Sequence, residues 1–195
     1  MRRVVVSEFV SLDGVMEDPG GAEGFDRGGW AFQFNRGAEG DRFKLDEVMD
    51  ADALLLGRVT YQGFAAAWPS RTDDVGFADK MNSMVKFVVS TTLGTADWNN
   101  STMIRANVAE EVARLKREPG KDILVAGSRT LVQTLIEHDL VDQYRLMVFP
   151  IILGGGKRLF PDTAVACALT LVDSKAAGDG VLILIYERAA KPDAA

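Results

Sequence analysis

Residues 54–61 read LLLGRVTY and join a wholly apolar run to a Gly-Arg-x-Thr sequence. A short apolar run of this kind is typical of a strand covered on both faces, and Gly57 ends it. The residues that follow, 59–67, predict a helix that ends before Trp68-Pro69. Because the first turn of a helix presents unpaired N–H groups and partial positive charge, this junction favours a bound phosphate.

Three residues of this junction suit a nucleotide. Gly57 lets a ligand approach the backbone closely, and the Thr60 hydroxyl can donate a hydrogen bond to a pyrophosphate oxygen. Arg58 offers a forked, permanently charged set of donors for a phosphate monoester. The alternative interpretation is an ordinary strand–turn–helix with Arg58 on its surface.

A second strand end has the same pattern. Residues 123–126 form a short apolar strand, Gly127-Ser128 follows, and residues 130–137 predict a helix. The small pair Gly127-Ser128 lets a dinucleotide approach the start of that helix. A Gly-Ser turn is also common in proteins that bind no nucleotide, so the pair carries weight only together with the other strand ends.

A third strand end carries hydroxyl groups. The expected strand over 86–90 runs into Ser90, Thr91 and Thr92, which can bind an adenosine phosphate or merely cap a turn. Ligands of open α/β sheets sit outside the carboxyl ends of the strands. The three ends together therefore predict a dinucleotide site, although the chain has no G-x-G-x-x-G fingerprint.

The order of the expected elements indicates the fold class. A first strand over 3–10 and a glycine-rich loop to about residue 40 lead into alternating strands and helices, and consecutive strands close the chain. Alternation implies parallel crossovers, and consecutive strands imply an antiparallel edge. We expect one α/β domain over residues 1–188, with a mostly parallel central sheet, antiparallel C-terminal strands and flanking helices, and a disordered tail at 189–195.

The composition narrows the choice of partners. The 195 residues carry a net charge of −6, and no basic run offers a face for nucleic acid. One cysteine, Cys167, and one histidine, His138, are too few for a structural zinc site. No apolar run reaches the roughly 18 residues of a membrane helix, and the N-terminus does not read as a signal peptide. We expect a cytoplasmic protein that binds no nucleic acid, membrane or metal.

The chain resembles the dihydrofolate-reductase-like family, including the reductase domain of bacterial riboflavin biosynthesis. The resemblance extends from Val4 to about Arg188, and its motifs occur in order: SLDG at 11–14, LGRVTY at 56–61, KFVVS at 86–90, VAGS at 125–128, LVD at 140–142 and PIILGGG at 150–156. The resemblance implies a three-layer α/β fold and hydride transfer from NADPH to a heterocyclic or conjugated C=N or C=O bond. It also implies a homodimer, in which apolar strands such as 146–152 pair or pack across chains.

The resemblance also assigns residues to the cofactor. It implies that Gly57, Arg58 and Thr60 surround NADPH, with Arg58 and either Ser90 or Thr91 near the 2′-phosphate. It further implies that the pyrophosphate is lined by Gly127, Ser128 and Thr130.

The chain departs from the riboflavin-pathway pattern at the polar groups that hold a phosphoribosyl-uracil substrate. Val15 follows Ser-Leu-Asp-Gly where a lysine is usual, and Ala126 stands where a glutamate is usual. The resemblance therefore implies a reductase without naming its substrate. The alternative is a non-catalytic nucleotide-binding or ligand-sensing module of the same fold.

Three residues are candidates for work on the substrate. Asp13, at the end of the first strand, is a candidate proton donor, or else a turn residue before Gly14. Trp30 and Phe32 lie in the long loop and can stack on a flat substrate or on nicotinamide. The alternative for both aromatic residues is that their burial anchors the loop.

Overall fold

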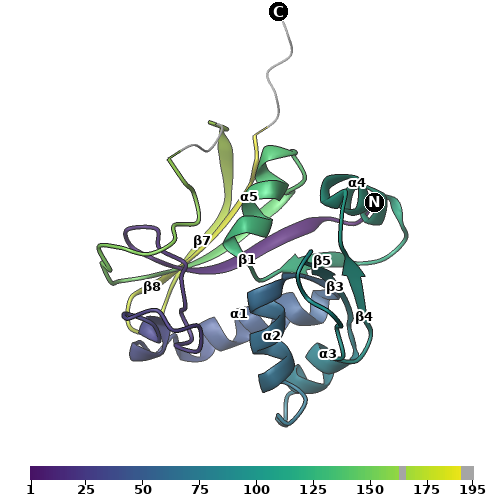
Figure 1. The fold of residues 1–195 in the computed structure, drawn as a ribbon. Helices are drawn as coiled ribbons and strands as arrows, with labels where there is room; N and C mark the ends of the chain where they lie inside the picture. The colour runs from purple at the N-terminus through teal and green to yellow at the C-terminus, as the bar shows by residue number, and fades with distance from the viewer. Residues whose placement is uncertain (163–165, 190–195) are drawn as a thin grey trace, which may run out of the picture.

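The computed structural model describes residues 1–162 and 166–189, which form an eight-stranded sheet in the order β4-β3-β2-β5-β1-β6-β8-β7 (Figure 1). The strands are β1 Val4–Ser11, β2 Ala51–Gly57, β3 Val85–Val89, β4 Ser101–Ile104, β5 Asp122–Val125, β6 Gln143–Phe149, β7 Leu169–Ala177 and β8 Val181–Arg188. The first six strands pair in parallel, while β8 pairs antiparallel with both β6 and β7. The expected α/β sheet with an antiparallel C-terminal edge is thus confirmed.

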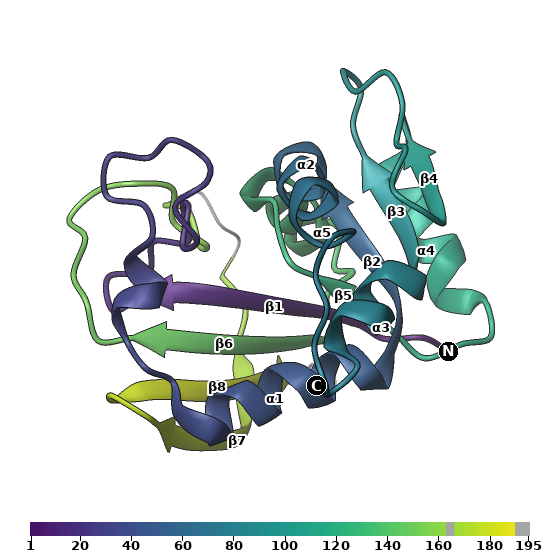
Figure 2. The ribbon, with the colours of Figure 1, turned by 90° about the horizontal axis from the view of Figure 1, so that it is seen from below.

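Helices cover both faces of the sheet (Figures 1 and 2). The helices are α1 Gly37–Asp50, α2 Arg58–Ala67, α3 Phe77–Ser83, α4 Val108–Arg117 and α5 Arg129–Glu137, with a 3-10 turn at Trp30–Gln33. Residues of α4 and α5 pack with one face of the sheet, and residues of α1, α2 and α3 pack with the other. The result is the three-layer arrangement that the resemblance implied.

The central strands are apolar without alternation because both of their faces are buried. In β2, Leu55 packs in the cluster that contains α4 and α5, whereas Leu54 and Leu56 pack in the opposite cluster. All three leucines have no exposed surface. A strand that alternates between two cores has no polar face, which explains why a continuous apolar run marks it in the sequence.

Two short elements have weak sequence patterns and were not expected. Strand β4 reads STMI and has one buried residue, Ile104. Helix α3 reads FADKMNS, and the Asp73 carboxylate accepts hydrogen bonds from the N–H groups of Phe77 and Ala78 at its start. Strand β4 is ordered by its pairing with β3, and α3 by the Asp73 hydrogen bonds together with the burial of Ala78 and Met81.

One part of the dimer expectation is wrong. Strand β6 lies between β1 and β8, so residues 146–149 are paired on both sides and cannot pair edge to edge with a second chain (Figure 2). The two edge positions belong to β4 and β7, and β7 is exposed along nearly its whole length. The expected tail falls largely on residues 190–195, which lie outside the described residues. Within the described residues, no helix is long and apolar enough to cross a membrane.

The burial of β2 predicts a large cost for removing a central side chain. Leu55→Ala should lower the free energy of unfolding by about 2–5 kcal/mol, because the methyl groups are lost from a fully buried site between the sheet and the layer of α4 and α5. The same truncation at Leu12, which is 63% exposed, should cost less than about 1 kcal/mol. Urea unfolding followed by circular dichroism measures both values, and equal losses would contradict the described packing.

Candidate functional site

The carboxyl ends of β2, β3 and β5 meet at one edge of the sheet. Gly57 pairs with Val89 of β3, and Leu55 pairs with Val125 of β5. Beyond that ladder, the Gly57 N–H donates a hydrogen bond of 3.1 Å to the carbonyl oxygen of Gly127. The strand ends that the sequence singled out are therefore direct neighbours.

Four residues at this edge form a compact group, here called the strand-end cluster: Gly57, Thr60, Gly127 and Ser128. A methyl group at Gly57 would overlap the Ser128 side chain and lie 2.9 Å from the Ser128 nitrogen. A methyl group at Gly127, whose φ is +93°, would lie 2.9 Å from Thr60 Oγ1. Side chains larger than hydrogen are thus excluded at both glycines, and the Thr60 and Ser128 hydroxyls share one site.

Two helix N-termini converge on the strand-end cluster from opposite faces of the sheet. Helix α2 begins after Gly57 and helix α5 begins after Ser128 (Figure 1). Neither capping residue has a side-chain hydrogen bond to the first turn of its helix. The first-turn N–H groups of both helices therefore point toward the cluster, and their partial positive charge favours a bound anion there. Thr130 is exposed in the first turn of α5.

The residues expected near a 2′-phosphate differ in how free their side chains are. Arg58 is exposed, and its Nη1 donates a hydrogen bond of 3.0 Å to Gln62 one turn along α2. Ser90 is buried, and its hydroxyl accepts hydrogen bonds from the N–H groups of Thr92 and Leu93 at 3.1 and 2.9 Å. The Ser90 hydroxyl therefore caps a turn, which was the alternative to its binding a phosphate. Thr91 is exposed beside it.

Arg105, which no pattern in the sequence singled out, belongs to the same edge. The residue follows β4, whose last residue Ile104 accepts a hydrogen bond from the Ser90 N–H at 3.1 Å. The Arg105 guanidinium donates to the carbonyl oxygens of Leu93 and Gly94 at 2.8 and 2.6 Å, and so fastens the loop that carries Ser90. Its position could be found only by predicting β4, because nothing else in the sequence links Arg105 to Ser90.

Glu8, a charged residue in the middle of β1, is a further candidate that was not predicted. Glu8 is 8% exposed, and its Oε1 has no hydrogen-bond partner among the described residues. A methyl group at Gly127 would lie 3.6 Å from this oxygen. Burial, helped by the charges of Glu23 and Glu47 and opposed by Lys44, raises the pKa of Glu8 to about 8. The signal in the sequence was a glutamate in the otherwise apolar run VVVSEFV.

A pocket of about 220 Å³ lies beside β1 near the long loop. Its aromatic wall includes Phe9 and Phe149, whose ring centroids are 5.2 Å apart. The guanidinium carbon of Arg36 lies 5.7 Å from the centre of the Phe9 ring. Phe32, 74% exposed, also lines this pocket. Aromatic rings beside a cation suit a flat, polar heterocycle.

A buried polar group lies on β1 next to that pocket. Lys44 of α1 is within 5.2 Å of the Phe9 ring centre and donates a hydrogen bond of 2.9 Å to the Ser7 hydroxyl. The Ser7 hydroxyl donates to the Glu47 carboxylate at 2.8 Å, and Lys44 pairs with the same carboxylate. Because these partners satisfy one another, the charge of Lys44 is already matched before any ligand arrives.

Trp30, one of the residues expected to contact the substrate, has a structural role instead. Trp30 is fully buried, its indole N–H donates to the Glu17 carbonyl oxygen at 2.8 Å, and its ring packs edge-on against Phe149. No face of the Trp30 ring is therefore open to a ligand, which is the loop-anchoring alternative.

Both carboxylate oxygens of Asp13 already accept hydrogen bonds. Its carboxylate accepts hydrogen bonds from the Ser11 hydroxyl and from the N–H groups of Leu153 and Gly154. Desolvation alone would raise the pKa of Asp13, but these three hydrogen bonds outweigh it and lower the pKa to about 2. A carboxyl group that is ionised throughout the neutral range cannot serve as a proton donor there.

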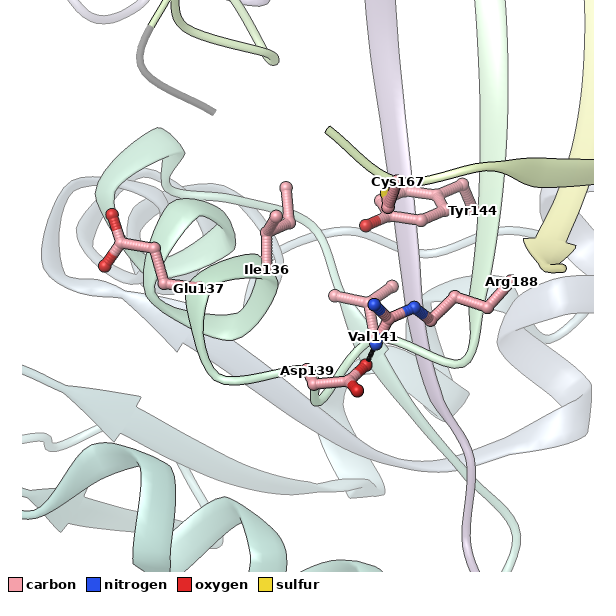
Figure 3. Close-up of a pocket in the computed structure, with 7 residues that line it drawn as sticks. All are labelled: Ile136, Glu137, Asp139, Val141, Tyr144, Cys167 and Arg188. Carbon is pink, nitrogen blue, oxygen red and sulfur yellow. Dashed lines mark ion pairs between the residues drawn. The ribbon is translucent and has the colours of Figure 1, made fainter. Parts of the chain in front are cut away.

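A smaller pocket of about 90 Å³ lies at the other end of α5, away from Ser128 (Figure 3). The ion pair between Asp139 and Arg188 crosses it, and Tyr144 lines one side. Burial raises the pKa of Tyr144 to about 12, so its hydroxyl stays protonated. The pocket is remote from the strand-end cluster and too small for a nucleotide.

The sheet order, with polar strand ends grouped at one edge, is that of a dihydrofolate-reductase-like fold. The family model of the RibD C-terminal domain matches residues 2–183, and the chain belongs to this family. The chain is 31% identical over 188 residues to the uncharacterized protein YyaP of Bacillus subtilis, covering 95% of this chain and 94% of that protein. It is 29% identical over 188 residues to YwjB of the same organism, covering 96% and 99%.

Solved structures share the fold. A candidate riboflavin biosynthesis protein from Shewanella sp. PV-4 superposes with a TM-score of 0.76 at 21% identity, covering 96% of this chain and 99% of that one. A pyrimidine reductase-like protein from Corynebacterium diphtheriae superposes with a TM-score of 0.59 at 14% identity, covering 97% and 93%. The resemblance inferred from the motifs is therefore confirmed at the level of family and fold.

The contact between Gly57 and Ser128 predicts an asymmetric effect of two glycine substitutions. Gly57→Ala should destabilise the protein by about 1–3 kcal/mol, because the methyl group overlaps the Ser128 side chain. Gly63→Ala, within α2 and with open space around the added methyl, should instead stabilise it by about 0.5–1 kcal/mol. Thermal unfolding measures both. A Gly57→Ala protein as stable as the parent would contradict the close approach.

Proposed function

We propose that this protein is an NADPH-dependent reductase that transfers hydride to a C=N or C=O bond of a small heterocyclic or conjugated substrate. The strand-end cluster carries the proposal, because two hydroxyls, two glycines and two uncapped helix N-termini converge at one sheet edge. That combination suits the charged linker of a dinucleotide. Membership of the RibD C-terminal domain family supports a reductase role.

In this proposal each strand end has one task. Gly57, Thr60, Gly127, Ser128 and Thr130 hold the pyrophosphate through backbone N–H groups and hydroxyls. The 2′-phosphate lies toward β3, where Arg58 reaches it with its guanidinium and Thr91 with its hydroxyl. Bound nicotinamide supplies the hydride, and the protein's work is to orient the ring against the substrate.

The substrate in this proposal lies against the aromatic pocket beside β1. Phe9 and the exposed Phe32 offer stacking surfaces, and Arg36, which is paired with Asp41 of the same pocket, offers further N–H donors at that wall. These groups favour a flat ring with polar substituents. The lysine and glutamate that the riboflavin pathway uses are replaced by Val15 and Ala126, so the substrate proposed is a heterocycle other than the phosphoribosyl-uracil.

NADPH binding tests the cofactor assignment directly. Saturable quenching of tryptophan fluorescence at sub-millimolar NADPH is expected. Arg58→Ala should weaken the binding of NADPH by about tenfold and the binding of NADH by less than about twofold, because only NADPH carries the 2′-phosphate. Arg114→Ala on α4, an arginine paired with Glu111 and Glu118, is the matched control and should change neither affinity. Equal losses for NADPH and NADH would remove Arg58 from this role, and absence of quenching would count against the function.

A second candidate function is a non-catalytic nucleotide-binding or ligand-sensing module. The observation that favours it is the loss of both polar substrate groups, at Val15 and Ala126. NADPH oxidation followed across a panel of pterins, flavins and quinoid compounds separates the two functions. A protein that binds NADPH and oxidises it with none of them belongs to the second class.

We also propose a cytoplasmic homodimer. The single cysteine suits a reducing compartment. Strands β7 and β8 expose Leu171, Val172 and Leu182 at 50%, 53% and 43%, a group of apolar side chains that a second chain can cover. Light scattering should give twice the chain mass, and Leu171→Asp should shift it toward the monomer. A monomeric parent protein would end this proposal.

A further inference from the structure

Glu8 is a buried acid with an unused oxygen. It lies on β1, is 8% exposed, and its Oε1 makes no hydrogen bond within the described residues. A buried polar atom without a partner costs free energy, and native proteins keep few such atoms. An unused oxygen of this kind, next to a candidate site, points to a partner that arrives with a ligand.

Glu8 lies just beyond the point where the neighbouring strands β1 and β5 stop pairing. The ladder between β1 and β5 ends at Val6 and Val125, whereas β1 continues alongside β6 as far as Ser11 and Phe149. Glu8 lies just past this point, where the chain after β5 turns into Gly127-Ser128. Since the same face of Gly127 meets both Thr60 Oγ1 and Glu8 Oε1, the unused oxygen borders the strand-end cluster.

The protonation state of Glu8 decides which ligand group it can bind. Its pKa is raised to about 8, mainly by burial; Lys44 acts to lower the pKa, and Glu23 and Glu47 act to raise it. Lys44 does not neutralise Glu8 by contact, because it pairs with Glu47 and donates to Ser7. At pH 7 Glu8 is thus mainly a neutral carboxylic acid with one O–H donor and one carbonyl acceptor.

A neutral carboxylic acid complements an amide edge, which presents one N–H donor and one carbonyl acceptor side by side. The strand order β3-β2-β5-β1 gives the order in which the parts of a bound dinucleotide would lie along the sheet edge. If the 2′-phosphate lies at β3 and the pyrophosphate between β2 and β5, the other end of an extended dinucleotide reaches β1. That end is nicotinamide, whose carboxamide has such an edge.

We propose that Glu8 binds the carboxamide of the nicotinamide ring, donating its O–H to the carboxamide oxygen and accepting the carboxamide N–H. The inference rests on the proposed function, since it needs a nicotinamide nucleotide at the strand-end cluster. Glu8 is then a specificity residue that fixes the rotation of the ring and thereby chooses the face from which hydride leaves.

Calorimetric titration with two ligands tests the assignment. NADPH carries the nicotinamide ring, and 2′-phospho-ADP-ribose has the same phosphates without it. Glu8→Leu should weaken the binding of NADPH by about tenfold and leave the affinity for 2′-phospho-ADP-ribose unchanged, because only NADPH has a carboxamide that loses its partner. Glu8→Gln keeps a donor and an acceptor and should bind NADPH within about threefold of the parent. Glu110→Gln, which removes an exposed carboxylate on α4 that is not among the charges acting on Glu8, is the control for a general change of charge and should change neither affinity.

Two further readouts separate binding from a structural role. Glu8→Leu should unfold at the same or a higher temperature than the parent, because it removes a buried group without a partner. NADPH affinity of the parent should fall as pH rises through about 8, where Glu8 ionises and loses its donor, whereas Glu8→Gln should show no such fall.

The outcomes distinguish this inference from the function it rests on. If NADPH and 2′-phospho-ADP-ribose both bind, and Glu8→Leu leaves both unchanged or weakens both equally, the carboxamide assignment is wrong and the nucleotide site stands. If neither ligand binds the parent protein, the proposed function fails and this inference fails with it. If Glu8→Leu does not fold, Glu8→Gln decides: retained NADPH affinity without the fall above about pH 8 supports the assignment, whereas a pH dependence equal to that of the parent overturns it.

Discussion

The structure depends on the close approach of two strand ends, where the Gly57 N–H meets the Gly127 carbonyl oxygen at 3.1 Å. That approach is possible because neither residue has a side chain, and it holds Ser128 against Gly57 and Thr60 against Gly127. The same bond extends the pairing of β2 and β5 past the end of their ladder. It thereby brings the starts of α2 and α5 to one point although the two helices cover opposite faces of the sheet.

The sequence predicted most of the sheet, because the central strands are buried on both faces and so leave unbroken apolar runs. The runs at 54–56 and 123–126 are the clearest cases. Strand β4 escaped prediction because it is short, polar and half-exposed, and the order of the C-terminal strands escaped because an apolar pattern does not say which strand lies at an edge. The stretch 146–152 was assigned to an interface for that reason.

The candidate site was predicted where the backbone determines it and missed where the side chains do. A glycine at a strand end indicates a close approach of the backbone, so the proximity of Gly57 and Gly127 could be predicted, while their role in binding stays a prediction. The meaning of Asp13, Trp30 and Glu8 depends on which groups surround each side chain. Asp13 is fully hydrogen-bonded, Trp30 has no open face, and Glu8 lacks a partner, and none of these conditions is written in the neighbouring sequence.

The order of strands along the functional edge also sets a length. Neighbouring strands lie about 4.8 Å apart, so the path from β3 across β2 and β5 to β1 measures roughly 14 Å. Under the proposed function, a bound dinucleotide has to extend over this distance, with its phosphate groups at β3, β2 and β5 and its nicotinamide at β1. The spacing of the strands would then fix how far apart the two ends of such a ligand are held.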